Sequence, residues 1–190
     1  MKVLVVVDVQ NDFITGSLRN EEAIKKVPNI VNKIRNFKGD KIIVTRDTHY
    51  NNYLNTKEGE KLAVEHCIEF TEGWELEKHV EAELQNAEFC IHADSHKMTT
   101  VTYIQKPTFG SLELADIVSG FEKGTEIEVV GFCTDICVVS NALILKAALY
   151  DKAEITVDAS CCAGVTKETH KAALETMKMC QINVINEDEE

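Results

Sequence analysis

The feature that most constrains the fold is a set of short, unbroken apolar runs that end at polar residues. The run 2–8 reads Lys-Val-Leu-Val-Val-Val-Asp, and the run 126–131 has the same character. A strand that is apolar on both faces is typical of a parallel sheet with helices on both sides. Strands are therefore predicted at 2–8, 41–45, 101–105, 126–131, 154–158 and 182–185.

Helical patterns lie between these runs, at 20–26, 28–37, 75–86, 111–118, 134–150 and 167–179. Pro28 is expected to restart a helix, because proline is favoured in a first turn. The segment 46–100 is the least regular, and Glu88–His92 is a candidate for a further short strand. The alternation predicts βαβ units, hence one three-layer α/β/α domain over 1–190 with a mainly parallel sheet of about six strands. The irregular segment is predicted to be an insertion, around 46–100, that carries part of the functional site.

Composition narrows the class of protein. A net charge of −12 argues against nucleic acid or an anionic membrane as partner. No stretch is long enough to span a bilayer, and Asp8 interrupts the first apolar run before a signal-peptide cleavage region. The seven cysteines form an odd number without a Cys-x-x-Cys pair, which fits neither a disulfide framework nor a zinc finger. Reduced thiols in a cytoplasmic protein are expected.

Three side chains that could act in catalysis lie at or after the ends of predicted strands: Asp8, Lys106 and Cys137. Cys137 falls in the first turn of a predicted helix, where the helix dipole lowers thiol pKa and backbone N–H groups converge. An aspartate can take the thiol proton, and a lysine can hold the thiolate. Cys137 alone would suit a packing position equally well. The carboxyl ends of parallel strands meet at one edge, so the three together favour a covalent catalytic site.

A candidate metal site follows the second predicted strand. Asp47 and His49 form an Asp-x-His pair on one side of an extended segment, and His66 comes 17 residues after His49. The spacing alone leaves the question open, because two histidines and an aspartate also occur together in polar loops that bind nothing.

These motifs resemble the signature of the isochorismatase-like cysteine hydrolases, especially nicotinamidases. The matching segments, in the family's order, are Asp8-Val-Gln-Asn-Asp-Phe13, Lys106-Pro107 and Gly131-Phe-Cys-Thr-Asp-Ile-Cys137-Val. The resemblance implies that Cys137 is the nucleophile, Asp8 the proton carrier and Lys106 the third member of the triad. It also implies a cis peptide at Phe132–Cys133, and an oxyanion hole formed by the N–H groups of Cys133 and Cys137.

The resemblance further implies one divalent ion, usually zinc, iron or manganese, and no organic cofactor. Its ligands would be Asp47, His49 and His66, with Glu58 as an added carboxylate. For the substrate pocket, Phe13 matches the family's ring-stacking phenylalanine.

Trp74 is a candidate second wall of that pocket, although a core position would suit it equally. Ala63 stands where many nicotinamidases carry an aromatic residue, so the sequence defines the reaction class better than the substrate.

The sequence therefore predicts an amidase that hydrolyses nicotinamide to nicotinate and ammonia through a thioester on Cys137. A relative that cleaves another small amide or ureido compound is an alternative, favoured by Ala63. An isochorismatase proper would lack the cysteine nucleophile. A non-catalytic metal or redox protein is the alternative from a different class. The family also leads us to expect a homo-oligomer, either a dimer or a tetramer.

Overall fold

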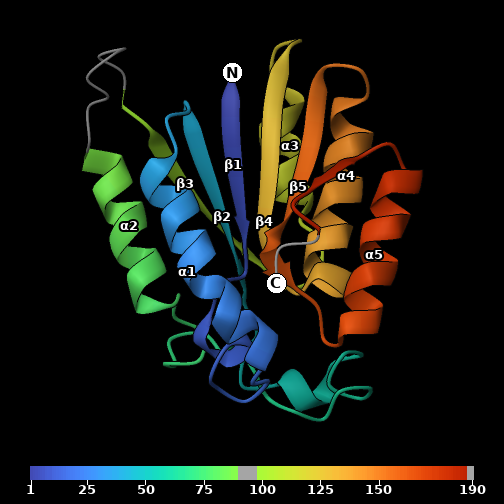
Figure 1. The fold of residues 1–190 in the computed structure, drawn as a ribbon. Coiled ribbons are helices and arrows are strands. Elements are labelled where there is room, and N and C mark those ends of the chain that lie inside the picture. Colours follow the sequence, from blue (N-terminus) through green and yellow to red (C-terminus); the bar gives the residue numbers. More distant parts are fainter. Residues whose placement is uncertain (90–97, 188–190) are drawn as a thin grey trace.

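Six parallel strands form a single sheet in the computed structural model, which describes residues 1–89 and 98–187 (Figure 1). Their order across the sheet is β3-β2-β1-β4-β5-β6, and every neighbouring pair is parallel. The strands are β1 (Lys2–Val7), β2 (Lys41–Asp47), β3 (Thr100–Lys106), β4 (Thr125–Phe132), β5 (Ala153–Ala163) and β6 (Asn183–Ile185). The predicted parallel sheet is confirmed, with β5 extending five residues beyond the expected end at 158.

Five helices of the described residues cover the two faces of this sheet. One face packs against α1 (Glu21–Asn36) and α2 (Lys78–Phe89). The other face packs against α3 (Leu112–Ser119), α4 (Val139–Leu149) and α5 (Lys167–Met179). From β1, the chain first forms β2 and β3 on one side and then β4, β5 and β6 on the other. Right-handed crossovers therefore put the two groups of helices on opposite faces. The predicted three-layer α/β/α domain is confirmed.

The helix α1 is continuous, so the expected restart at Pro28 is wrong. Asn20 caps the helix by accepting hydrogen bonds from the N–H groups of Glu22 and Ala23, and Pro28 lies inside it. A proline within a helix removes one backbone hydrogen bond. Here Ala23 before it and the buried apolar residues after it pack on the same sheet face, and this packing outweighs the lost bond.

Two other boundaries differ from the sequence-based expectation. The helix α2 begins at Lys78 rather than 75, because the Glu77 carboxylate accepts hydrogen bonds from the N–H groups of His79 and Val80. The strand proposed at Glu88–His92 is wrong for Glu88 and Phe89, which end α2. The rest of that proposed strand lies outside the described residues.

Residues 48–77 pass over the carboxyl ends of the strands with little regular structure. A 3-10 turn at Tyr53–Asn55 lies within this segment. Isolated bridges pair His49 with Ile68, and Gln10 with Leu76. These contacts hold the segment against the end of the sheet where β1 and β2 finish.

A polar cavity of about 800 Å³ lies between the second half of α1 and the first halves of β4 and β5. Its walls include Lys33 of α1, Glu126 and Glu128 of β4, and Asp158 of β5. Within residues 1–89 and 98–187, no helix has the length and apolar character needed to cross a membrane.

Candidate active site

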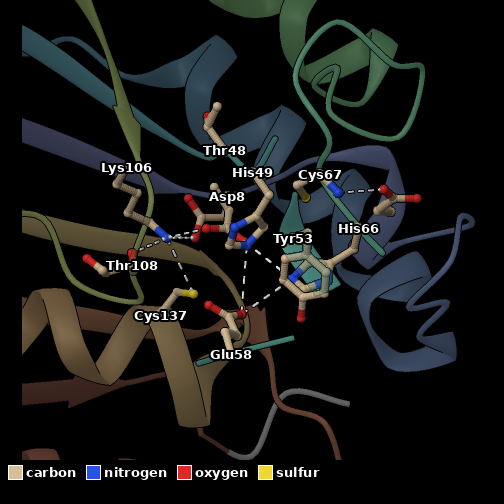
Figure 2. A network of polar contacts seen from close by, with 12 residues as sticks. Asp8, Thr48, His49, Tyr53, Glu58, His66, Cys67, Lys106, Thr108 and Cys137 are labelled. Atoms are coloured by element: carbon tan, nitrogen blue, oxygen red, sulfur yellow. Dashed lines mark hydrogen bonds and ion pairs between the residues drawn. The ribbon is translucent and has the colours of Figure 1, made fainter. Parts of the chain in front are cut away.

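Asp8, Lys106 and Cys137 lie together at the carboxyl end of the sheet (Figure 2). Lys106 belongs to the edge strand β3 and reaches past the end of β2. Its Nζ lies 2.6 Å from Asp8 Oδ2 and 3.6 Å from Cys137 Sγ, and it donates to the Thr108 carbonyl at 3.1 Å. The three side chains are buried, with exposed fractions of 0, 1 and 4%. A thiol, a carboxylate and an ammonium group are thus in mutual contact.

The backbone at the ends of β1 and β4 sets this arrangement. Asp8 has a φ of +49°, which is uncommon for a residue with a side chain, and its Oδ1 accepts from Thr45 Oγ1 at 2.7 Å. Gly131 has a φ of +123°, and a Cβ there would lie 2.0 Å from the Val7 carbonyl oxygen. Only glycine permits this approach of β4 to β1. The peptide bond Phe132–Cys133 is cis, as the resemblance implied.

Cys137 is carried by a wide turn of π type, Thr134–Val138, that precedes α4. The Cys133 carbonyl accepts hydrogen bonds from the N–H groups of Ile136 and Val138, at 3.1 and 3.0 Å, and so closes the turn. Farther along, the fully buried Asn141 donates to the Cys137 carbonyl and accepts from Ser111 N–H. This amide ties the turn to Ser111, in the loop that follows β3 and its last residue, Lys106.

Burial raises the pKa of the Cys137 thiol well above its usual value. The Asp8 carboxylate, to which the thiol donates a hydrogen bond, raises it further, and Lys106 only partly opposes this. The lowering of this pKa expected from the helix terminus is therefore opposed by burial and by the Asp8 charge, and the direction of the shift is upward. Burial also raises the pKa of Asp8, against the effect of Lys106. The resting site holds a thiol next to a carboxylate that can take its proton.

A second polar cluster, formed by Asp47, His49 and His66, lies beside the first. Their candidate ligand atoms all lie within 4.8 Å of one another, and all three residues are buried. Asp47 Oδ2 is 3.1 Å from His49 Nε2 and 3.5 Å from His66 Nε2. Glu58 Oε1 completes the group at 3.7 and 3.6 Å from the same two nitrogens. Two imidazoles and two carboxylates are thus grouped together, and Figure 2 shows Glu58 directed toward His49 and His66.

The donor set fits a divalent ion of the transition series. The His66 Nδ1 lies 2.9 Å from the Val64 carbonyl, which can only accept, so Nδ1 carries the proton and Nε2 keeps its lone pair for a ligand. Burial raises the pKa of Asp47, but the neighbouring histidines and the Lys106 ammonium carry it well below its ordinary range. The cluster could therefore hold a metal ion through two nitrogens and two oxygens.

Both clusters open onto one cavity of about 760 Å³. Cys133 and Cys137 line one part of it, and Asp47, Glu58 and His66 line another. The remaining walls are largely apolar and include Phe13, Leu18, Leu62, Phe109, Ile136 and Val165. Phe13 thus lies where the sequence analysis expected it. Phe109 was missed, although an aromatic residue three positions after Lys106 was a usable signal.

Trp74 is not among the residues that line this cavity. Its side chain is 5% exposed, its indole N–H donates to Thr48 Oγ1 at 2.9 Å, and the Arg46 guanidinium lies 4.8 Å from its ring centroid. Of the two positions considered for Trp74, the structure places it in the core. Ala63 is exposed.

The chain matches the family model of the isochorismatase domain over residues 2–189. It belongs to the isochorismatase family. The family resemblance drawn from the three motifs is thereby confirmed. A comparison of this family member with curated protein sequences finds no match.

Solved structures of the family share the fold along nearly the whole chain. The nicotinamidase PncA from Bacillus subtilis is 26% identical, with a TM-score of 0.75, covering 97% of this chain and 99% of that one. The pyrazinamidase of Pyrococcus horikoshii in complex with zinc is 28% identical, with a TM-score of 0.71 and coverage of 97 and 98%. The pyrazinamidase/nicotinamidase from Streptococcus mutans, at 23% identity, TM-score 0.77 and coverage of 97 and 100%, shows the shared fold alone.

Proposed function

We propose that this protein is a cysteine amidohydrolase that converts nicotinamide to nicotinate and ammonia. The observation that carries the proposal is the contact of Asp8, Lys106 and Cys137 at the wall of an apolar cavity. The similarity to structures of nicotinamidases and a pyrazinamidase supports a carboxamide as substrate.

In the first half of the reaction, Asp8 takes the proton from Cys137 as the sulfur attacks the carboxamide carbon. The proton moves along the hydrogen bond that joins the two side chains. Lys106 stays charged, since Asp8 and the other acidic groups around it hold its pKa above the ordinary value despite burial. Its ammonium compensates the negative charge on the sulfur. The N–H groups of Cys133 and Cys137 are proposed to receive the oxyanion, with each such donor contributing about 3–4 kcal/mol.

In the second half, protonated Asp8 donates its proton to the leaving nitrogen, and ammonia departs to leave a thioester on Cys137. Asp8, again a carboxylate, removes a proton from water as the water oxygen attacks the thioester carbon. The same proton then returns to the Cys137 sulfur as the acid product is released. Asp8 thus serves alternately as base and acid, which suits a carboxyl group whose pKa is raised by burial.

We further propose that Asp47, His49, His66 and Glu58 hold one divalent ion, with zinc as the first candidate. The donor set supports this, as does the zinc complex of the Pyrococcus horikoshii pyrazinamidase. Such an ion supplies a Lewis-acidic position that can bind the ring nitrogen of a pyridine substrate. Phe13 and Phe109, on the walls of the same cavity, would enclose the ring.

A different small amide or ureido compound is the second candidate for the substrate. Two observations favour it: Ala63 is exposed rather than forming a pocket wall, and the cavity of about 760 Å³ has room beyond a single pyridine ring. Both candidates share the reaction and the residues that perform it.

Ammonia release over nicotinamide, pyrazinamide, several aliphatic amides and ureido compounds tests the proposal. We expect nicotinamide to be hydrolysed and Cys137→Ala to abolish turnover. Cys180→Ala is the matched control, since Cys180 is an exposed free thiol. Turnover by Cys137→Ala at the wild-type rate would refute the mechanism. Hydrolysis of a ureido compound alone would identify that compound, rather than nicotinamide, as the substrate.

We also propose a cytoplasmic homo-oligomer. All six cysteines of the described residues are free thiols, which supports a reducing compartment. Light scattering coupled to size exclusion would measure the oligomeric state.

A further inference from the structure

Among the described residues, Tyr53 is the largest side chain that is completely buried. It lies against the candidate metal ligands Asp47, His49 and His66, here called the metal cluster. Its ring centroid is 4.8 Å from that of His49 and 5.0 Å from that of His66, with interplanar angles of 60° and 77°. Figure 2 shows the Tyr53 ring beside the two imidazoles, and these tilted and edge-on contacts restrict the rotation of both. One ring thus packs against both candidate nitrogen ligands, in addition to the Val64 carbonyl that holds His66.

The hydroxyl of the same side chain holds the loop that follows it. Tyr53 Oη donates to the Leu62 carbonyl at 2.9 Å. Leu62 lines the cavity and is 38% exposed, so its position has few other constraints from packing. Removal of the Tyr53 hydroxyl would take this hydrogen bond away from the Leu62 carbonyl.

The backbone of Tyr53 also organises the turn that carries Glu58. Its carbonyl accepts from Thr56 N–H at 2.9 Å and from Thr56 Oγ1 at 2.7 Å. Gly59 lies so close that a Cβ there would be 2.2 Å from the same carbonyl oxygen. Glu58 lies between Thr56 and Gly59, so its position is set by backbone that packs against Tyr53.

We infer that Tyr53 is a positioning residue that couples the metal cluster to the cavity wall formed by loop 56–62. The ring orients His49 and His66, and the hydroxyl fixes the wall at Leu62. The inference rests on the proposed metal site and goes beyond it, because it makes metal affinity and substrate affinity depend on one residue that touches neither the metal nor the substrate.

Two variants separate the ring from the hydroxyl. Tyr53→Phe keeps the ring, so we expect Zn²⁺ affinity, measured by competition with a chromogenic chelator, to stay within about threefold of wild type. Hydrogen exchange in 56–62 should accelerate, and the KM for the amide hydrolysed best should rise while kcat changes little. Tyr53→Leu removes the ring contacts, so Zn²⁺ affinity should fall about 10–100-fold, as for other groups that orient metal ligands.

Leu145→Ala is the control for general destabilisation, since Leu145 is fully buried in α4 on the opposite sheet face. It should lower stability and leave Zn²⁺ affinity unchanged. If Tyr53→Leu does not fold, Tyr53→Met, whose unbranched and flexible side chain adapts better to the space of the ring, replaces it. Wild-type Zn²⁺ affinity in the ring-deleted variant, or unchanged exchange of 56–62 in Tyr53→Phe, would overturn the inference. A protein that binds Zn²⁺ and hydrolyses no amide would refute the proposed function and leave these affinity and exchange comparisons decisive for Tyr53.

Discussion

The Asp8 charge favours the neutral form of one buried neighbour and the charged form of the other. It raises the pKa of the Cys137 thiol and also raises that of the Lys106 ammonium, so it disfavours the thiolate and favours the cation. Both effects favour a protonated sulfur beside a charged lysine in this site. In the proposed mechanism the thiolate forms only as Asp8 gains the proton, so the step that activates the nucleophile also prepares the acid for the leaving group.

The variant Asp8→Asn should therefore separate reactivity from turnover. Removing the negative charge lowers the pKa of Cys137, because Lys106 then acts on the thiol without opposition from Asp8. The pH midpoint for iodoacetamide labelling of Cys137, followed by mass mapping, should shift downward. Amide turnover should nevertheless fall by about 10²–10⁴-fold or more, since asparagine cannot carry the proton.

The labelling of exposed Cys180 in the same sample provides the internal control and should not shift. A labelling midpoint for Cys137 that is unchanged or higher in Asp8→Asn would contradict the electrostatic account. Turnover at the wild-type rate would show that another group carries the proton.

Between elements, an ion-pair network fastens α1 to the sheet on the side away from the catalytic cluster. Lys33 Nζ lies 2.7 Å from Asp158 Oδ2 and 2.6 Å from Glu128 Oε1, so one helix residue contacts β5 and β4. Asp158 is 1% exposed and also accepts hydrogen bonds from Ser160 and Asn186. These partners lower its pKa despite burial.

Asp158→Asn should lower the free energy of unfolding at pH 7 by about 1–3 kcal/mol, because Lys33 loses a buried ionic partner. A carboxyl group with a lowered pKa in the folded state stabilises the protein above its unfolded pKa, and this contribution is lost as the pH falls through the folded value. The difference between variant and wild type should therefore shrink below about pH 4. Urea titrations at pH 7 and pH 3 would measure it.

Asp151→Asn is a suitable comparison, because the Asp151–Lys123 pair is exposed and should contribute little, within about 0.5 kcal/mol. A loss for Asp158→Asn that stayed the same at both pH values would argue against the charge as its cause.

The elements differ in how far the sequence could define them. The strands were predictable because runs such as Val3–Val7 are buried on both faces, and the positions of Asp8 and Lys106 followed from those strands. The continuous path of α1 through Pro28 depends on packing against the sheet, which no local pattern reveals. The raised pKa of Cys137 and the contacts of Tyr53 likewise depend on burial and on residues distant in sequence. The sequence of the irregular segment 46–100 showed which residues could bind a metal ion, but not how their side chains lie relative to one another.

For the whole molecule, two apolar cores, one on each face of the sheet, hold the fold together. One core packs α3, α4 and α5, and the other packs α1 and α2 and reaches the Asp47–His49–His66 cluster at Phe13, whose ring contacts His66. Folding should therefore not require the ion. Removing it with a strong chelator should leave the far-UV circular dichroism spectrum unchanged while nicotinamide turnover collapses.

Adding Zn²⁺ back at about 100 times its dissociation constant should stabilise the fold by roughly 2.7 kcal/mol. For a chain of this size, that corresponds to a rise in Tm of roughly 5–10 °C in calorimetry. A chelated sample with the spectrum of an unfolded chain would show that the metal cluster, rather than the two cores, determines folding.

The strand β4 (Thr125–Phe132) begins at the polar cavity beside α1 and ends directly before Cys133, which lines the cavity at the carboxyl end of the sheet. Its two ends should therefore differ in their tolerance of mutation. A library that replaces each β4 residue in turn should accept many side chains at Glu126, which is exposed. The same library should reject nearly every replacement at Gly131, where a Cβ meets the Val7 carbonyl oxygen. Selection acting on such a strand would let the surface at one end diversify while the chemistry at the other end stays unchanged.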